Sequence, residues 1–365
     1  MYRPTKIIID LAAIQANCRL AQTLASHSKT VAVVKADAYG HGAIEVAKAL
    51  ELQIEMLAVS CLEEALILRE NGLRKPILLL EGCFDNAELE IAHNNQCEIV
   101  VHSSLQLTHL LNATLETPIS VWLKIDTGMH RLGILPQEVE STYAKLNASR
   151  NVKNIILVTH FAHADDVGGA HTAKQISRFE ACIQPIVSDT KQKVELSMAN
   201  SAALLAWPQT RVEWNRPGIM LYGLSPFDEV IDQAKQLIPA MTFESQVIAL
   251  RDISVGESVG YGCTWTAKRQ SIIATIAVGY GDGYPRSAKS GTPVLINGHR
   301  APLVGRVSMD LISVDVTDLQ NVNIGDPTIL WSKDLSANEV ASWADTIGYE
   351  LVTRMPKRAA ITFLN

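Results

Sequence analysis

Over residues 10–230, short apolar runs rich in β-branched side chains alternate with stretches whose apolar positions recur at helical spacing. A short apolar run at residues 7–9 precedes Asp10, which can cap a helix from Leu11 to about Ser26. The strand-like runs that follow are residues 31–35, 56–59, 77–80, 98–101, 119–125, 155–160 and 194–196, with a last one at 212–214 or 218–221. Seven or eight parallel strands with interposed helices predict an α/β fold, a (β/α)8 TIM barrel over residues 10–230.

The pattern changes after about Phe227, where helical spacing nearly vanishes. Short apolar runs are now separated by turns rich in Gly, Pro, Asp and Asn; they are residues 246–250, 272–278, 293–296, 312–316 and 328–330. One small helix is predicted around residues 336–347. Residues 231–365 therefore read as a second, mainly antiparallel C-terminal β-domain.

Composition and charge narrow the class of protein. The chain has 365 residues, 47% of them hydrophobic, and a net charge of −6, which argues against nucleic-acid and membrane-surface partners. It has no run of about 18 apolar residues, and the N-terminus lacks the features of a signal peptide, so we expect a cytoplasmic protein. The 6 cysteines include no Cys-x-x-Cys pair, which favours reduced thiols over disulfides or zinc ligands.

Lys35 ends the apolar run 31–35, and a glycine-punctuated turn and a helical pattern from Ala43 to Leu50 follow it. Because strand tips and the loops after them build the active sites of parallel barrels, this lysine is a candidate for chemistry. Partial burial lowers the pKa of a lysine and makes it a nucleophile able to form a Schiff base. The alternative is a strand-end lysine that extends its amine into water.

The residue sequence of this turn favours a reactive lysine over a solvated one. Residues 35–42 read Lys-Ala-Asp-Ala-Tyr-Gly-His-Gly, which resembles the pyridoxal-phosphate lysine motif of the alanine racemases, and further matches follow in order up to Tyr349. The resemblance implies a fold-type III enzyme with pyridoxal 5'-phosphate as cofactor. It also implies that residues 1–9 form a strand that joins the second domain, and that the protein is a homodimer with composite active sites.

The resemblance assigns cofactor contacts to residues near several strand ends. They are Lys35, Tyr39, His160, Asn200, Ser201, Arg216, Gly218, Ile219 and Tyr349. Ser201 begins a helical pattern, so it could equally be a helix N-cap. Arg216 is implied to face the pyridine nitrogen, and a guanidinium, which is never deprotonated, makes the ring a weaker electron sink than a carboxylate would.

Residues 124–133 (Lys-Ile-Asp-Thr-Gly-Met-His-Arg-Leu-Gly) end another strand and enter a glycine turn. Lys124 and Arg131 would repel each other at one strand tip, so we expect an anion between them; solvated surface cations are the alternative. The resemblance implies that Arg131 contacts the substrate carboxylate. It further implies that Lys124 supports this arginine, in many members as a carbamate.

A cluster of histidines and aspartates at residues 160–166 could suggest a metal site. His160 and His163 would need helical spacing to share one face, but His160 ends a strand and the segment after it reads as a loop. We therefore expect no metal here, only hydrogen-bonded or solvated groups.

In the second domain, residues 259–265 (Val-Gly-Tyr-Gly-Cys-Thr-Trp) resemble the catalytic tyrosine segment of the family. Racemisation needs a base on one face of the α-carbon and an acid on the other. The resemblance implies that Lys35 serves the D-alanine side and Tyr261 of the partner subunit the L-alanine side. A tyrosine in a glycine-rich turn is the alternative.

Two further turns match the family. Residues 279–284 suggest a dinucleotide loop only superficially, because no helix follows; Tyr280 is implied to line the substrate entrance. In residues 305–310, the Met309 backbone is implied to bind the substrate carboxylate, with Asp310 supporting it. Ordinary strand-end turns would look the same.

These observations predict a racemase that interconverts L-alanine and D-alanine, either to supply D-alanine for peptidoglycan or to form L-alanine for catabolism. A racemase of another small amino acid such as serine is one alternative, because the methyl group of alanine and the hydroxymethyl group of serine fit a pocket of modest size about equally well. A decarboxylase of the same fold type would pair the pyridine nitrogen with a carboxylate, where this chain has Arg216. A non-catalytic pyridoxal-phosphate carrier would need neither Tyr261 nor the β-domain.

Overall fold

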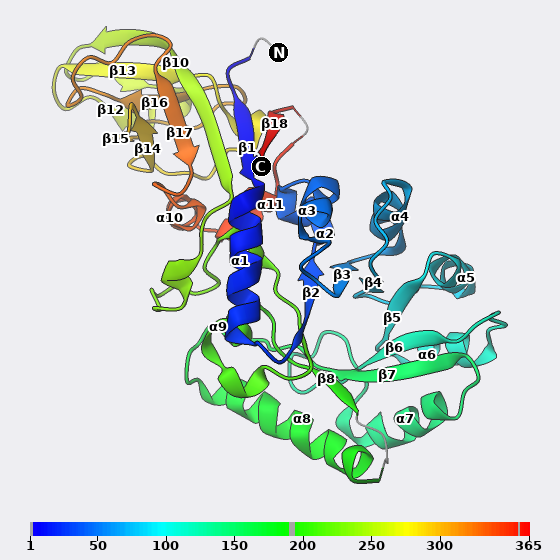
Figure 1. The fold of residues 1–365 in the computed structure, drawn as a ribbon. Coiled ribbons are helices and arrows are strands. Elements are labelled where there is room, and N and C mark those ends of the chain that lie inside the picture. The colour runs from blue at the N-terminus through cyan, green and yellow to red at the C-terminus, as the bar shows by residue number, and fades with distance from the viewer. Residues whose placement is uncertain (1–2, 190–193, 357) are drawn as a thin grey trace.

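The computed structural model of the chain describes residues 3–189, 194–356 and 358–365. Its ribbon forms a ring of strands and helices and, next to it, a sheet of mainly antiparallel strands (Figure 1). The long helix α1 (Leu11–Leu24) connects the two. Asp10 caps this helix as expected, because its carboxylate accepts a hydrogen bond from the Ala13 amide at 2.9 Å.

The described residues form a closed barrel in which each strand pair is parallel. The barrel strands are β2 (Lys29–Val33), β3 (Met56–Val59), β4 (Ile77–Leu79), β5 (Cys97–Val101), β6 (Ile119–Lys124), β7 (Val152–Val158), β8 (Glu195–Ser197) and β9 (Trp214–Asn215). Strand β9 pairs with both β8 and β2, which closes the ring. The predicted (β/α)8 barrel is therefore confirmed. Its last strand lies at the first of the two expected positions, while the second forms the 3-10 helix η3 (Ile219–Tyr222).

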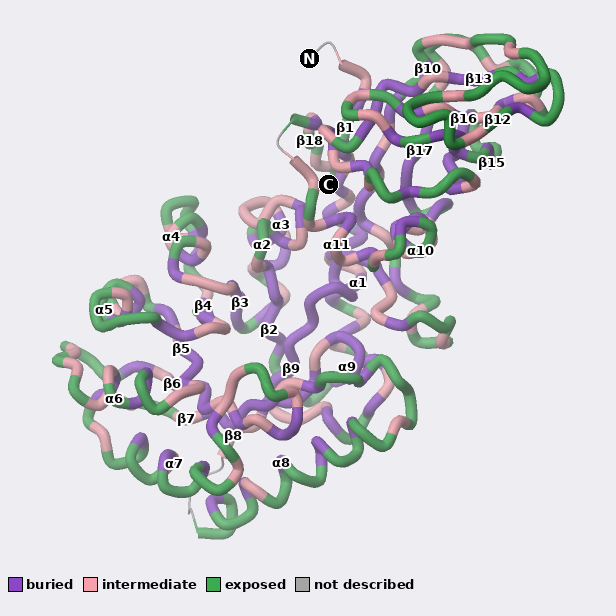
Figure 2. The backbone as a smooth tube through the Cα atoms, turned by 180° about the vertical axis from the view of Figure 1, so that it is seen from behind, coloured by how far each residue is buried: buried purple, intermediate pink, exposed green. Residues whose placement is uncertain are grey.

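Helices cover the outside of the barrel, and their buried residues face the strands (Figure 2). The helices are α3 (Ala43–Leu50), α4 (Leu62–Glu70), α5 (Asn86–Asn94), α6 (Ser104–Asn112), α7 (Val139–Asn147), α8 (Ala170–Asp189) and α9 (Ser201–Ala206). The short segment α2 (Lys35–Gly40) instead follows the end of β2 and contributes to a cavity described below. Short 3-10 turns are η1 (Pro136–Glu138), η2 (Pro208–Thr210) and η4 (Ala234–Gln236). Along β2, Val31 and Val33 point into the barrel and Ala32 points out to the helices, as the two-residue period of a strand requires.

The second part of the fold is a sheet with two small helices. The strands of this sheet that follow the barrel are β10 (Met241–Ile253), β13 (Ser271–Ile276), β14 (Pro293–Ile296), β15 (His299–Pro302), β16 (Ile312–Asp315), β17 (Pro327–Trp331) and β18 (Ala360–Leu364). Strands β11 (Ser258–Val259) and β12 (Trp265–Thr266) form a separate two-stranded sheet, and the 3-10 turns are η5 (Tyr261–Cys263) and η6 (Tyr280–Asp282). The predicted helix at 336–347 is in fact α10 (Ala337–Trp343), and a second helix, α11 (Gly348–Thr353), follows it. The pairing is antiparallel except between β18 and the N-terminal strand, so the predicted C-terminal β-domain is confirmed.

Strand β1 (Lys6–Asp10) lies in this second sheet, antiparallel to β10 and parallel to β18, so the two chain ends lie side by side (Figure 1). Residues 1 and 2 of the expected N-terminal strand segment lie outside the described residues. The division of the chain at residues 230 and 231 stays a prediction. None of the helices in the described parts of the chain is long and apolar enough to cross a membrane.

Candidate active site

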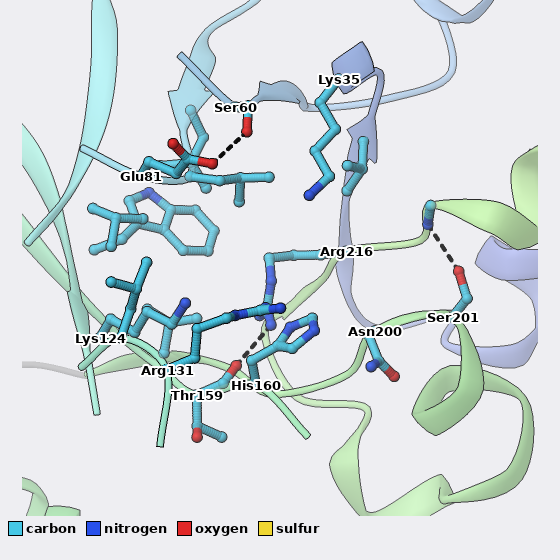
Figure 3. A pocket seen from close by; sticks show the side chains of 18 of the residues that line it. Lys35, Ser60, Glu81, Lys124, Arg131, Thr159, His160, Asn200, Ser201 and Arg216 are labelled. Atoms are coloured by element: carbon cyan, nitrogen blue, oxygen red, sulfur yellow. Dashed lines mark hydrogen bonds between the residues drawn. The ribbon is translucent and has the colours of Figure 1, made fainter. Parts of the chain in front are cut away.

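A cavity of about 470 Å³ lies at the carboxyl ends of the barrel strands, and the side chains of several strands point into it (Figure 3). Strand geometry explains which side chains reach it. The inner core of the barrel contains Val33, Ala58, Trp122, Val158 and Trp214. The residues two positions further along are Lys35, Ser60, Lys124, His160 and Arg216, and all of them line the cavity. Each polar group therefore continues the inward-facing series of its own strand.

Lys35 begins helix α2 and lies two residues beyond the end of β2, slightly later than the sequence indicated. The next residues, Ala36 to Tyr39, have φ angles between 51 and 53°, which makes this a left-handed turn without glycine. Such a conformation costs roughly 1–2 kcal/mol per residue, so surrounding contacts must hold it. One of them is the Asp37 carboxylate, which accepts a hydrogen bond from the Ala43 amide at 2.7 Å.

The lining of the cavity is strongly cationic. Lys35, Lys124, Arg131 and Arg216 contribute positive charge, whereas Glu81 is the one acidic side chain among the described lining residues. Burial, followed by the charges of Arg216, Arg131 and Lys35, lowers the pKa of Lys124 to about 8. A cavity with this excess of positive charge favours an anionic ligand.

Arg216 is the most firmly held of these cations. Its guanidinium is buried and donates hydrogen bonds to the Thr159 carbonyl at 2.7 Å, to the Met198 carbonyl at 3.3 Å and to the Ser197 hydroxyl. Burial lowers its pKa to about 10, so it remains protonated at neutral pH. The barrel therefore presents a fixed positive charge at the base of the cavity.

His160 faces the same cavity as a neutral ring. Burial, and then the nearby charges of Arg216 and Lys124, lower the pKa of His160 well below its usual value. The neighbouring His163 instead lies near Asp166, with 3.6 Å between Nδ1 and Oδ2. Within the described residues, no group of three or more His, Cys, Asp or Glu side chains is placed to hold a metal ion.

One end of the cavity is built for close approach of a small anion. The Ser201 hydroxyl accepts hydrogen bonds from the backbone amides of Gly218 at 2.8 Å and Met220 at 3.3 Å. A side chain at Gly218 would place its Cβ 2.7 Å from the Tyr39 hydroxyl, so glycine keeps this end open. The helix N-cap considered for Ser201 is in fact Asn200, whose side chain accepts from the Ala203 amide at 3.0 Å.

Two tyrosines complete this end. The rings of Tyr39 and Tyr349 lie 6.2 Å apart, and both line the cavity. Helix α11, which belongs to the second part of the fold, therefore contributes a side chain to the barrel cavity. Gly40 allows this contact, because a Cβ there would lie 1.9 Å from the Val352 carbonyl oxygen in α11. Burial raises the pKa of Tyr39 to about 12, so its hydroxyl stays protonated and can donate to an anion.

These features fit pyridoxal 5'-phosphate. The Lys35 amine suits the carbonyl group of the cofactor, and the buried Arg216 guanidinium suits its pyridine nitrogen. The hydroxyl donors around Gly218 suit its phosphate. All of the residues that the sequence analysis assigned to the cofactor line the cavity, together with Lys124 and Arg131: Lys35, Tyr39, His160, Asn200, Ser201, Arg216, Gly218, Ile219 and Tyr349.

The remaining candidates lie elsewhere in the chain. Tyr261, Met309 and Tyr280 lie in turns of the second part of the fold, do not line the cavity, and are 72, 53 and 40% exposed. The two turns that carry Tyr280 and Met309 are joined, because the Gly281 amide donates to the Met309 carbonyl at 2.8 Å. The Asp310 carboxylate forms an ion pair with Arg358.

Sequence reasoning missed other polar groups in the lining. The Ser60 hydroxyl donates to the Glu81 carboxylate at 2.7 Å, and the Thr159 hydroxyl pairs with that of Thr127, also at 2.7 Å. Ser60 could have been found from the two-residue period of its strand, because it follows the inward-facing Ala58. Glu81 gives no such signal, because the inward-facing series of β4 runs through Leu78 and Leu80 and Glu81 lies one residue beyond it.

Comparisons with known proteins identify the family of the chain. Residues 9–226 match the family model described as alanine racemase, N-terminal domain, and residues 240–363 match the one described as alanine racemase, C-terminal domain. The alanine racemase of Pseudoalteromonas atlantica is 52% identical over 100% of both chains. The catabolic alanine racemase of Pseudomonas putida is 44% identical and covers 97% of this chain and 98% of its own.

Among solved structures, the biosynthetic alanine racemase from Pseudomonas aeruginosa matches with a TM-score of 0.95 and 43% identity over 100% of both chains. The alanine racemase from Acinetobacter baumannii matches with a TM-score of 0.93 and 37% identity over 99% of this chain and 100% of that one. Since both parts of the fold are matched and relatives are this similar over their full length, the chain belongs to the alanine racemase family.

Proposed function

We propose that the cavity binds pyridoxal 5'-phosphate through Lys35 and that the protein uses it to interconvert L-alanine and D-alanine. The observation that carries this proposal is the convergence of Lys35 with Arg216, Arg131 and Lys124 in one cationic cavity at the mouth of the barrel. A phosphate and a substrate carboxylate would together compensate this charge. When bound, pyridoxal phosphate makes the α-hydrogen of an amino acid acidic enough to be removed.

Residues of this chain would hold both the phosphate and the ring of pyridoxal phosphate. The Tyr39, Ser201 and Tyr349 hydroxyls and the amides of Gly218 and Ile219 would bind the phosphate, since they line the open end of the cavity. Arg216 would face the pyridine nitrogen. With a pKa of about 10 it stays charged at neutral pH and is a poor proton donor to that nitrogen. Neutral His160 and the Asn200 side chain would pack beside the ring.

Proton transfer at the α-carbon needs groups on two faces. The Lys35 amine would take or return the proton on the D-alanine side. Tyr261 cannot serve the other face from within its own chain, because it is 72% exposed and lies outside the cavity. We therefore propose a homodimer in which Tyr261 and Met309 of each subunit complete the cavity of the other. Leu311, two residues after Met309, is a further large apolar side chain that is exposed (38%), which supports a subunit interface there.

The substrate carboxylate would bind Arg131, with the Met309 backbone of the partner subunit as a second contact. Lys124 lies next to Arg131 (Figure 3), and its lowered pKa leaves a fraction of the amine neutral near pH 8. A neutral amine can react with carbon dioxide to form a carbamate, which would convert a repulsive neighbour of Arg131 into an attractive one. Tyr280 and Asp310 would border the route by which alanine enters.

The first experiment tests the lysine, the cofactor and the reaction in one sample. Protein reconstituted with pyridoxal phosphate should acquire a visible absorbance band, and borohydride should abolish the band and fix a phosphopyridoxyl group on the peptide that contains Lys35. Unreduced protein should bring the circular dichroism of L-alanine to zero, and the rate with L-serine measures side-chain tolerance. A Lys35→Ala protein serves as the control. Cofactor fixed elsewhere, or L-alanine left unchanged by the loaded protein, would contradict the proposal.

A second experiment tests the composite site. Subunits with Lys35→Ala and subunits with Tyr261→Phe carry different affinity tags and are purified as mixed dimers. If the two residues act from different chains, each mixed dimer contains one site with both groups intact and should recover up to half of the parent activity. Mixed dimers that are no more active than either variant alone would show that both groups belong to one chain.

A further inference from the structure

The Glu64 side chain connects the carboxyl ends of strands β2 and β3, next to Lys35. Glu64 lies in the first turn of helix α4, and one carboxylate oxygen accepts a hydrogen bond from the Ala36 amide at 2.6 Å. The other oxygen accepts from the Ser60 amide at 2.7 Å. The Ala36 amide belongs to the peptide bond that directly follows Lys35, so this carboxylate holds the backbone from which the lysine side chain extends.

The register of the barrel explains why such a contact is needed. Strands β2 and β3 are parallel, and their ladder continues to the bond from the Val34 amide to the Ala58 carbonyl at 2.8 Å. The next rung would join the Ala36 amide to the Ser60 carbonyl, two residues further along each strand. That carbonyl instead accepts from the Glu81 amide at 3.3 Å. Glu64 therefore supplies the missing acceptor and extends the ladder by one rung.

The contact also begins the left-handed turn. Ala36 is its first residue, with φ of 51° and ψ of 52°. The rest of the turn is held by the Ala38 amide, which donates to the Val34 carbonyl at 2.8 Å, and by Asp37, whose carbonyl and carboxylate accept from the Gly42 and Ala43 amides at 3.0 and 2.7 Å. A glutamate in the first turn of a helix often accepts from backbone amides just before that helix, and the bond to Ser60 is of this kind. The bond to Ala36 serves no such purpose, because Ala36 lies 28 residues earlier in the chain.

We propose that Glu64 is a positioning residue for Lys35: its carboxylate fixes the peptide after the lysine and so sets where the amine enters the cavity. The inference rests on the proposed function for the role of the amine, but the contact itself is independent of any ligand. A displacement of a reacting group by about 1 Å can slow a reaction roughly a hundredfold. Loss of Glu64 should therefore affect the rate of the chemical step, while Arg131 and the other anion-binding groups remain in place.

The test compares Glu64→Ala and Glu64→Gln with Glu63→Ala, a matched control because Glu63 is the exposed neighbour in the same helical turn. In cofactor-free protein, amide hydrogen exchange over residues 35–40 should become about tenfold faster in Glu64→Ala and stay unchanged in Glu63→Ala. Borohydride should fix pyridoxal phosphate to Lys35 more slowly in Glu64→Ala. Its kcat should fall roughly 10- to 100-fold with little change in the KM for alanine. Glu64→Gln, which keeps one acceptor, should give intermediate values and covers the case that the alanine variant does not fold.

The possible outcomes separate the two proposals. Unchanged exchange over residues 35–40, or a kcat within twofold of the parent, would overturn the role of Glu64 while leaving the proposed function intact. A rise in KM without a fall in kcat would equally overturn it, because it would place the defect in substrate binding. If the parent protein fixes no cofactor at Lys35, the proposed function fails, and the exchange data alone decide whether Glu64 holds the turn.

Discussion

Replacing Lys124 by methionine should make the cofactor-free protein more stable at neutral pH, although it removes a residue from the proposed active site. Lys124 carries its charge in a partly buried position, and the described residues offer it no ion pair. The charges of Arg216, Arg131 and Lys35 add to the cost of burial. Methionine keeps most of the apolar length of the side chain without the charge.

The size of the effect follows from the pKa. The pKa of Lys124 falls from 10.5 to about 8 in the folded protein, and at about 1.4 kcal/mol per pKa unit this corresponds to about 3 kcal/mol. Between these two pH values the unfolded chain binds more protons at this position than the folded one. The stability of the parent protein should therefore rise as the pH increases from 8 to 10.5, and the full penalty applies below 8. We expect Lys124→Met to raise the free energy of unfolding by up to about 3 kcal/mol at neutral pH.

Urea denaturation of cofactor-free protein, at one fixed protein concentration and in buffer free of carbon dioxide, measures this difference. Carbon dioxide must be absent because a carbamate would replace the cation by an anion. Lys145→Met is the matched control, since Lys145 is exposed on helix α7. The reasoning is refuted if Lys124→Met is no more stable than Lys145→Met at neutral pH, or if its advantage does not shrink as the pH approaches 10.5.

Three further predictions concern stability and are checked by thermal denaturation. Asp282 is fully buried and pairs with Arg3 at 2.7 Å and Arg358 at 3.2 Å, so Asp282→Asn should cost about 3–5 kcal/mol. Asp318→Asn, which removes an exposed ion pair with Arg269, should cost much less because solvent screens that pair, and similar losses for the two variants would contradict this. Ala36→Gly should leave the free energy of unfolding unchanged or raise it by up to about 1 kcal/mol, because glycine adopts the left-handed conformation without strain. The control Ala144→Gly in helix α7 should lower it by about 1 kcal/mol. Equal losses for the two variants would disprove strain at Ala36. Arg216→Met should lower stability by at least about 2 kcal/mol because it leaves buried carbonyls without donors, and an unchanged melting temperature would refute this.

The sequence predicts the barrel well because its strands are buried on both sides and read as continuous apolar runs. It also predicts that Lys35 and Lys124 lie at the same end of the barrel, since side chains at the carboxyl ends of parallel strands converge, whereas the place of Arg216 was implied only by the resemblance to the family. Strands β15 and β18 escaped prediction because most of their residues are only partly buried or exposed, so little apolar alternation marks them.

Other features carry no local signal at all. Four successive non-glycine residues after Lys35 adopt a left-handed conformation that their own preferences disfavour, so only tertiary contacts can impose it. The bond from Ala36 to Glu64 depends on the register of two strands, and a glutamate at the start of a helix reads as an ordinary surface residue. The distance of Tyr261 from the cavity of its own chain became clear only from its exposure in the folded chain.

The pairing of β1 between β10 and β18 also determines the order in which the protein can be completed during synthesis. Strand β1 (Lys6–Asp10) is synthesised before the barrel strands, and its parallel neighbour β18 (Ala360–Leu364) only after them. The barrel strands lie between Lys29 and Asn215 and pair only with one another, so the barrel can close before the second sheet is made. At that stage β1 has unpaired backbone groups, and the side chains of Ile7 and Ile9, which are buried in the folded protein, are exposed. Until β18 has been synthesised, the nascent chain therefore carries an open, aggregation-prone strand edge, and deletion of Ala360–Leu364 would leave that edge of β1 open.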